Sequence, residues 1–164
     1  GFDVTLVEYI GRGHEHFYDE IHRLFDWMKL HRRNFYPDQF QCATMRSFDN
    51  FFWYLELNDL PERSIVMPFT WPAPAAARPA MQEFRRTATN GLRIETGAGS
   101  ARLWLSPEVV ELRDRASITV NGRSRTYSLE PDIAVLLEDA RTRVDRQHPF
   151  WTRVELVTGK RPNR

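Results

Sequence analysis

The sequence contains one cysteine, Cys42, so neither a disulfide framework nor a zinc knuckle made of cysteines can form within the chain. It contains no apolar run near the roughly 20 residues that a transmembrane helix needs, and no basic-then-apolar signal opens it. Its 23 basic and 22 acidic residues leave a formal net charge of +1, which gives no overall field for polyanions. We therefore expect no membrane span and no nucleic-acid partner.

The composition is that of a globular protein. The chain has 164 residues, of which 41% are hydrophobic and 13% aromatic, well above what a disordered chain carries. This length fits one ordinary domain or two small ones and is sufficient to bury a core.

The first thirty residues follow a strand, turn and helix pattern. The apolar run from Val4 to Ile10 predicts a strand, and Gly11 and Gly13 end it. A helix is predicted from Phe17 to Leu30, because its apolar residues recur at helical spacing on one stripe: Ile21, Leu24, Phe25 and Met28. His14 lies between the predicted strand and the predicted helix.

The rest of the chain alternates with the period of strands. We predict strands at 40–46, 51–57, 84–88, 92–96, 101–105, 117–120 and 125–129, separated in part by the turn dipeptides Asn90-Gly91 and Asn121-Gly122. One late helix is predicted from Pro131 to Val144, with one apolar face: Ile133, Leu136, Leu137 and Ala140. The predicted fold class is α+β: a strand-loop-helix over residues 1–36, then a mostly antiparallel, sandwich-like β module over 37–164 with this one late helix.

The stretch from Val4 to Met28 resembles the last strand, catalytic-histidine loop and final helix of α/β-hydrolases of the prolyl-oligopeptidase and esterase type. In those proteins a strand and a Gly-x-Gly-His turn precede a helix that ends in Trp-Met or similar. The resemblance implies that His14 is the general base of a catalytic triad and that Gly11 and Gly13 form the turn that aims it, with His16 as the less favoured alternative.

The β-rich remainder is similar to the C-terminal extension of some uncharacterised peptidase-like members of the same superfamily. Four stretches carry this second resemblance: Asn50 to Glu56, Arg102 to Glu108, Ile118 to Gly122, and Leu137 to Phe150. They imply common ancestry rather than chemistry. The resemblance implies a C-terminal portion of a serine hydrolase, a peptidase or a carboxylesterase, acting on a small ester or peptide without a cofactor.

The sequence departs from the hydrolase pattern in its serines. It has no Gly-x-Ser-x-Gly elbow, and all seven serines follow His14, whereas the α/β-hydrolase order is serine, acid, histidine. Asp3 precedes the same predicted strand as His14, so it lies at the wrong end to serve as the triad acid. We therefore expect the nucleophile and the acid upstream of Gly1, and we expect the chain alone to be inert.

The alternative function is a non-catalytic β-sandwich module that binds carbohydrate or packs against another domain. Exposure of Trp53, Trp71 and Trp104 would favour binding, and their burial would favour packing. The aromatic run from Phe51 to Tyr54 is interpreted as core.

Two further patterns are interpreted without a catalytic or metal-binding role. His14, His16 and Glu20 match half of a cupin metal signature, but Glu20 falls in the predicted helix and the second half is missing, so no metal is expected. Residues 141–148 are interpreted as an ion-paired network that docks the late helix, with Glu138 and Asp139 as the acidic partners.

The apolar stripe of the predicted helix also predicts that another protein surface packs against it. Its four large apolar side chains need a cover, because leaving each in water forfeits about 1.5–3 kcal/mol. The cover could be the β module through Phe51 to Leu57 or a second copy of the chain. We favour a homo-oligomer, or association with an upstream hydrolase domain or fragment, through the N-terminal strand and helix.

Overall fold

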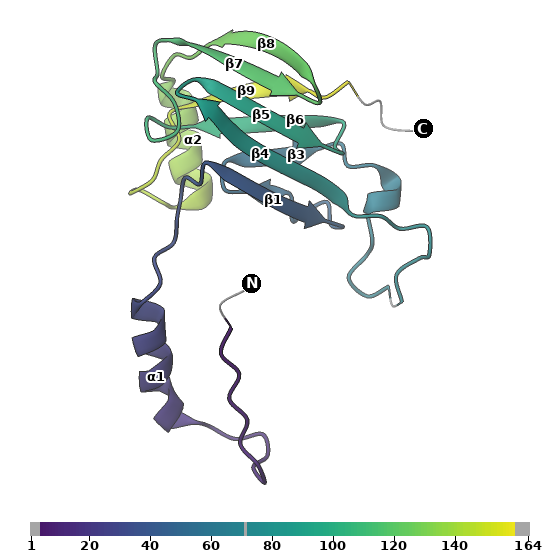
Figure 1. Cartoon of the computed structure of the whole chain (residues 1–164), viewed down its shortest axis with the longest axis vertical. Helices are drawn as coiled ribbons and strands as arrows, with labels where there is room; N and C mark the ends of the chain where they lie inside the picture. The colour runs from purple at the N-terminus through teal and green to yellow at the C-terminus, as the bar shows by residue number, and fades with distance from the viewer. Residues whose placement is uncertain (1–3, 71, 160–164) are drawn as a thin grey trace. The chain divides into compact units, whose positions relative to one another are not determined.

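A computed structural model describes residues 4–70 and 72–159 (Figure 1). The chain divides into two compact units, Gly1–Asn34 and Phe35–Arg164. Within the described residues the elements are two α-helices, one short 3₁₀ helix and nine strands, which confirms the predicted α+β class with mostly antiparallel sheets. Neither described helix is long and apolar enough to span a bilayer.

The first unit consists of an extended segment, a turn and helix α1 (Tyr18–Lys29). The helix was predicted correctly, but the prediction of a strand over Val4 to Ile10 is wrong: this segment is assigned to no strand and pairs with none. A strand needs a neighbour for its backbone N–H and C=O groups. The described part of this unit supplies no second strand, so the apolar pattern alone does not produce one.

The second unit is built from two sheets. The first sheet has five strands in the order β1 (Gln39–Thr44), β4 (Ala80–Ala88), β5 (Gly91–Thr96), β7 (Arg115–Val120) and β8 (Arg123–Ser128). The second has four, in the order β2 (Phe51–Phe52), β3 (Leu55–Asn58), β6 (Ser100–Leu105) and β9 (Thr152–Val157). All pairs are antiparallel except β5 with β7.

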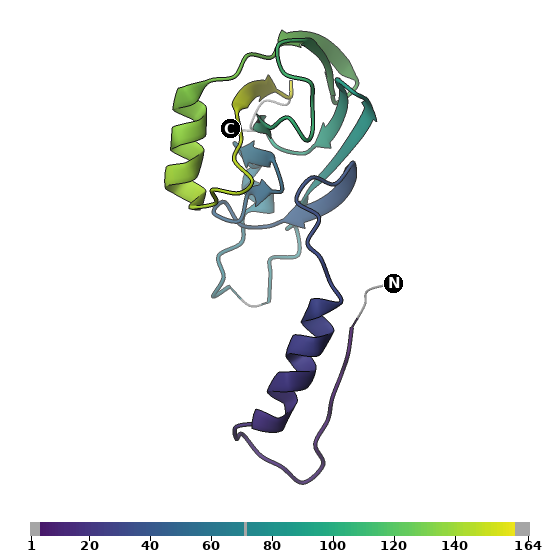
Figure 2. The ribbon, with the colours of Figure 1, turned by 90° about the vertical axis from the view of Figure 1, so that its left-hand side faces the viewer.

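Side chains from both sheets form one hydrophobic core. Figure 2 shows the ribbon of these strands from a second side. The strands alternate buried and exposed side chains; β9, for example, buries Thr152, Val154 and Leu156 and exposes the residues between them. The most deeply buried large side chains come from both sheets and the loops around them: Tyr54, Phe84, Phe150, Leu55, Leu57, Leu92, Ile94, Leu103, Leu105, Ile118, Leu129 and Leu156.

The predicted single strand at 51–57 is a tight hairpin instead. The chain reverses at Trp53 and Tyr54, where Trp53 adopts a φ of 53°. The Tyr54 ring is then buried, and its hydroxyl donates a hydrogen bond to the carbonyl of Pro37. The prediction of a core role thus holds for Tyr54 and in part for Phe52, whereas Phe51 and Trp53 are 37% and 36% exposed. The alternating pattern does not reveal the turn that separates them.

The late helix α2 (Ile133–Arg143) was predicted, but its predicted apolar face is wrong. Ile133 and Leu137 are 77% and 62% exposed, whereas Val135 and Asp139 are the buried residues of the helix. Asp139 lies on the buried side of the helix. Its carboxylate accepts hydrogen bonds from the guanidinium of Arg143 and from the backbone N–H of Phe150. A charged residue thus occupies the inner face that hydrophobic periodicity assigns to leucines.

Candidate functional site

The loop that carries His14 joins the extended segment to α1. Gly11 has a φ of 76°, a conformation that few residues other than glycine adopt, so this position makes the turn as predicted. His14 lies in a bend and is exposed, and His16 is exposed as well. Arg12 donates to Glu15 across the loop at 2.5 Å.

Two contacts that the sequence did not predict close the base of this loop. The Tyr9 hydroxyl donates to the carboxylate of Glu20 in α1, and the Tyr9 and Phe17 rings stack with centroids 4.9 Å apart. The hydrogen bond to Glu20 raises the pKa of the Tyr9 phenol. The turn between Tyr9 and Phe17 is therefore held at both ends, and His14 projects from the middle of it.

No carboxylate in the described part of the chain hydrogen-bonds to His14. The first unit contains no serine at all, and Asp3 lies outside the described residues. Glu20 is engaged by Tyr9, and no group of three His, Cys, Asp or Glu residues that could hold a metal occurs within residues 4–70 and 72–159. A triad at His14 would therefore need its serine and its acid from another part of the protein.

An apolar groove runs between the extended segment and α1. It measures about 780 Å³, and its lining includes Val4, Val7, Tyr9, Phe17, Leu24 and Trp27. No residue of α1 is buried. The predicted stripe of Ile21, Leu24, Phe25 and Met28 is 41%, 58%, 57% and 56% exposed. The first unit by itself thus leaves its apolar helix face uncovered.

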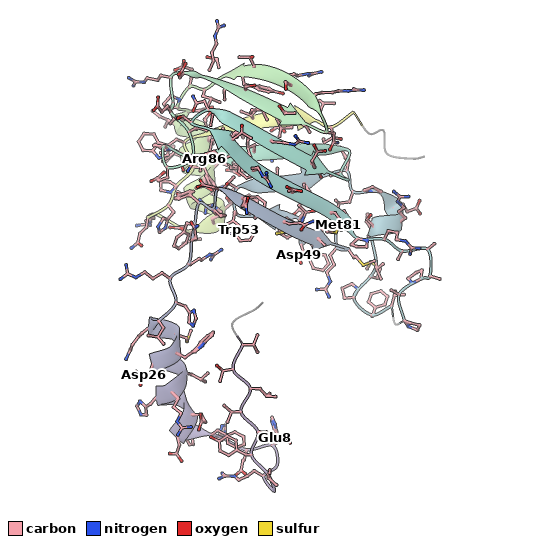
Figure 3. All side chains as sticks on the ribbon, viewed as in Figure 1. Glu8, Asp26, Asp49, Trp53, Met81 and Arg86 are labelled. Atoms are coloured by element: carbon pink, nitrogen blue, oxygen red, sulfur yellow. The ribbon has the colours of Figure 1, made fainter. Side chains whose placement is uncertain are left out.

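The tryptophans of the second unit form no common platform in its described part. Trp104 is 7% exposed, and its indole N–H donates to Glu56 at 2.8 Å. Trp53, labelled in Figure 3, is 36% exposed. Its ring stacks on Phe40 of β1 with centroids 4.7 Å apart. Trp71 lies outside the described residues. Burial of Trp104 favours the packing role, and the partly exposed Trp53 serves to cover Phe40.

The charged run at the C-terminal end of α2 is an ion-paired network, as predicted. Glu138 accepts from Arg141 at 2.7 and 3.0 Å, and Arg143 donates to Asp139 at 2.5 and 2.6 Å. Arg143 also donates to the carbonyl of His148 at 2.8 Å. These contacts tie the end of α2 to the segment that leads into β9, so the run stabilises the fold.

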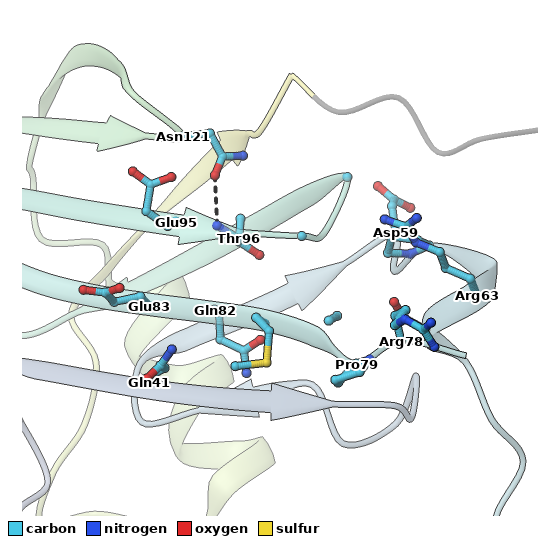
Figure 4. A pocket seen from close by; sticks show the side chains of 16 residues that line it. Gln41, Asp59, Arg63, Arg78, Pro79, Gln82, Glu83, Glu95, Thr96 and Asn121 are labelled. Carbon is cyan, nitrogen blue, oxygen red and sulfur yellow. Dashed lines mark hydrogen bonds between the residues drawn. The ribbon is translucent and has the colours of Figure 1, made fainter. Parts of the chain in front are cut away.

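A second hollow, of about 560 Å³, lies at one end of strands β4 and β5 (Figure 4). Its lining combines guanidinium, carboxylate and amide side chains with Pro61, Pro79 and Met81. Sequence reasoning did not find it, because its residues come from five separated segments with no motif spacing.

Comparisons with known proteins supply no assignment. No family model, no curated protein and no solved structure matches the chain. The functional argument therefore rests on the residues and on their geometry.

Proposed function

We propose that the chain is the C-terminal portion of a serine hydrolase of the α/β-hydrolase type, a peptidase or carboxylesterase, with His14 as its general base. In this proposal a hydrolase domain supplies the serine and the acid. His14 accepts the serine proton as the hydroxyl attacks an ester or peptide carbonyl, and returns it to the leaving group. The unit Phe35–Arg164 is an accessory β module attached to that domain.

The observation that carries the proposal is the exposed apolar face of α1 next to an exposed histidine loop. A helix of 12 residues with none of them buried is marginal in water. Covering Leu24, Phe25 and Met28 would be worth about 1.5–3 kcal/mol each. Such a unit is suited to packing on a larger apolar surface, and packing there would bring the His14 loop to that surface.

The geometry of the loop supports a role for His14 rather than a capping role. His14 makes no hydrogen bond in the described part of the chain, and α1 has no side-chain cap at its N-terminus. The loop is held by Tyr9, Glu20, Arg12 and Glu15 instead. His14 can therefore be replaced without loss of a contact that holds the loop.

The test is labelling with a fluorophosphonate, which reacts with activated serines. The polypeptide that carries this sequence is produced in the length that its gene encodes, as wild type, His14→Gln and His16→Gln. We expect labelling of the wild type, its loss in His14→Gln, and its retention in His16→Gln.

His16→Gln is the matched control, since His16 is exposed in the same loop. Helix content by circular dichroism should be the same in all three proteins. A wild type that the probe does not label, or equal labelling of wild type and His14→Gln, would sink the proposal.

A further inference from the structure

One loop of the second unit stands away from both sheets. It joins the 3₁₀ helix η1 (Glu62–Ser64) to β4, and Figure 1 shows its described part projecting beyond the strands. Residues 65–77, called the 65–77 loop below, include no charged side chain, although charged residues make up 27% of the sequence. The composition of this loop therefore differs from that of the rest of the chain and points to a contact that excludes charge.

The tip of the 65–77 loop is a tight turn that presents two large apolar side chains. The N–H of Thr70 donates to the carbonyl of Met67 at 2.9 Å, which closes a turn with Pro68 at its second position, where proline is favoured. Phe69, at the third position, is 81% exposed, and Met67 is 51% exposed. The turn thus holds both side chains out in water, which is unfavourable unless something covers them.

Hydrogen bonds within the loop hold this shape. At the neck, the N–H of Arg78 donates to the carbonyl of Arg63 at 3.1 Å, so the two ends of the loop lie together. The guanidinium of Arg78 donates to the carbonyls of Ala75 and Ala77 at 2.9 and 2.8 Å. Backbone groups that are paired in this way do not need water, so the loop can enter a less polar phase at a lower cost.

The neck of the loop carries charges of both signs. Asp59 lines the same hollow as Arg63 and Arg78, and Glu62 precedes Arg63 in the chain. No ion pair joins any of these four side chains to another residue of the described chain. Two cations and two anions in one neck match a zwitterionic headgroup layer, in which phosphates accept from arginines and ammonium groups meet carboxylates.

We propose that the 65–77 loop docks the chain on the surface of a phospholipid membrane with zwitterionic headgroups. Phe69 and Met67 enter the boundary between the headgroups and the acyl chains, where aromatic and apolar side chains are favoured. The charged neck stays among the headgroups. The loop belongs wholly to the second unit, so the proposal depends neither on His14 nor on the proposed hydrolase activity.

The shape and charge of the loop favour this partner over two others. A stable protein interface buries about 800 Å² on each partner, whereas the apolar surface of this tip is a convex turn that ends at a charged neck. A fluid lipid surface closes around such a tip without a fitted hole. A strongly anionic surface is not favoured, because the carboxylates of Asp59 and Glu62 offset the two arginines.

The test is flotation of the 164-residue chain with phosphatidylcholine vesicles in a density gradient. We expect the wild type to float at millimolar lipid and Phe69→Ser to bind about tenfold more weakly. Ile133→Ser is the matched control, since Ile133 is 77% exposed on α2, and it should bind as the wild type does. Replacing about a fifth of the lipid with phosphatidylglycerol, or adding about 0.5 M NaCl, should change binding by less than about threefold.

Leu24→Asp separates the loop from α1, whose exposed apolar face is a second candidate for lipid contact. It should float as the wild type does, and Phe69→Ser should keep the Tm of the wild type because an exposed side chain is replaced. Absence of wild-type flotation, or equal flotation of wild type and Phe69→Ser, would overturn the proposal. So would a loss in Leu24→Asp or Ile133→Ser as large as that in Phe69→Ser, or flotation that requires phosphatidylglycerol and disappears in salt.

Discussion

Asp139 and Arg143 form a charged pair across one turn of α2, with the carboxylate 2% exposed and the guanidinium 26% exposed. The same carboxylate accepts the backbone N–H of Phe150 at 3.0 Å, and the guanidinium carbon lies 4.1 Å from the centre of the Phe150 ring. A single buried acid thus joins α2 to the start of β9.

Asp139→Asn should destabilise the second unit by about 2 kcal/mol, because it leaves Arg143 without its counter-charge while burying an amide in its place. The measurement is urea unfolding, monitored by Trp fluorescence. Glu138→Gln is the control, since Glu138 and Arg141 are 43% and 70% exposed and such pairs contribute about 0–1 kcal/mol. Equal losses in the two variants would show that the buried pair does not hold the helix.

Tyr54 should make stability fall at alkaline pH. Burial raises the pKa of its phenol above the ordinary value of 10.0, so above pH 10 the unfolded chain releases a proton that the folded chain keeps. The free energy of unfolding then decreases as pH rises, by at most about 1.4 kcal/mol per pH unit.

Tyr54→Phe should cost about 1 kcal/mol at neutral pH, through loss of the hydrogen bond to Pro37, and should flatten the alkaline decline. Unfolding in urea at several pH values from 8 to 11 measures both effects. Tyr18→Phe, at an exposed position of α1, should keep the decline of the wild type. If the free energy of unfolding of Tyr54→Phe fell with pH as steeply as that of the wild type, Tyr54 would not be the group that causes the alkaline decline.

The 164-residue chain alone should hydrolyse p-nitrophenyl esters no faster than free imidazole at the same concentration. Its first unit has no serine near His14, and a histidine without nucleophile and oxyanion hole has no acyl-transfer mechanism. Initial rates at matched concentration decide this. Turnover that disappears when any one of the seven serines is replaced would contradict it.

The exposed face of α1 should make the chain associate when nothing else covers it. We expect oligomers of the wild type in sedimentation velocity, and a shift toward monomer with Leu24→Asp, because Leu24 is 58% exposed and lies in the apolar groove. Asp19→Asn, a polar change in the same helix, should leave the distribution unchanged. A stable wild-type monomer whose mass and solubility Leu24→Asp does not alter would rule this interface out.

Local chemistry made the hairpins and α1 predictable. Asn121 and Gly122 have φ values of 47° and 79°, the left-handed conformation that a two-residue hairpin needs, and they connect β7 to β8 as predicted. Likewise, residues 18–29 are helical because their apolar spacing and lack of proline favour a helix.

The features that could not be predicted from the sequence depend on contacts between distant parts of the chain. Strand β9 was not predicted, although Thr152, Val154 and Leu156 alternate with exposed residues. It forms by pairing with β6, about fifty residues earlier in the chain, which no local pattern encodes. The hollow at one end of β4 and β5 depends on which strands become neighbours, and no spacing in the sequence encodes it. The contact of Tyr9 with Glu20 likewise depends on how the turn folds back.

The most direct test of the central proposal is chemical rescue of His14. In the polypeptide of the length that its gene encodes, His14→Ala should lower ester turnover roughly 10⁴-fold or more, and added imidazole should restore part of it by acting as the missing base. His16→Ala should keep its turnover and should not respond to imidazole. Full turnover in His14→Ala, or rescue of His16→Ala instead, would contradict the assignment of His14 as the general base.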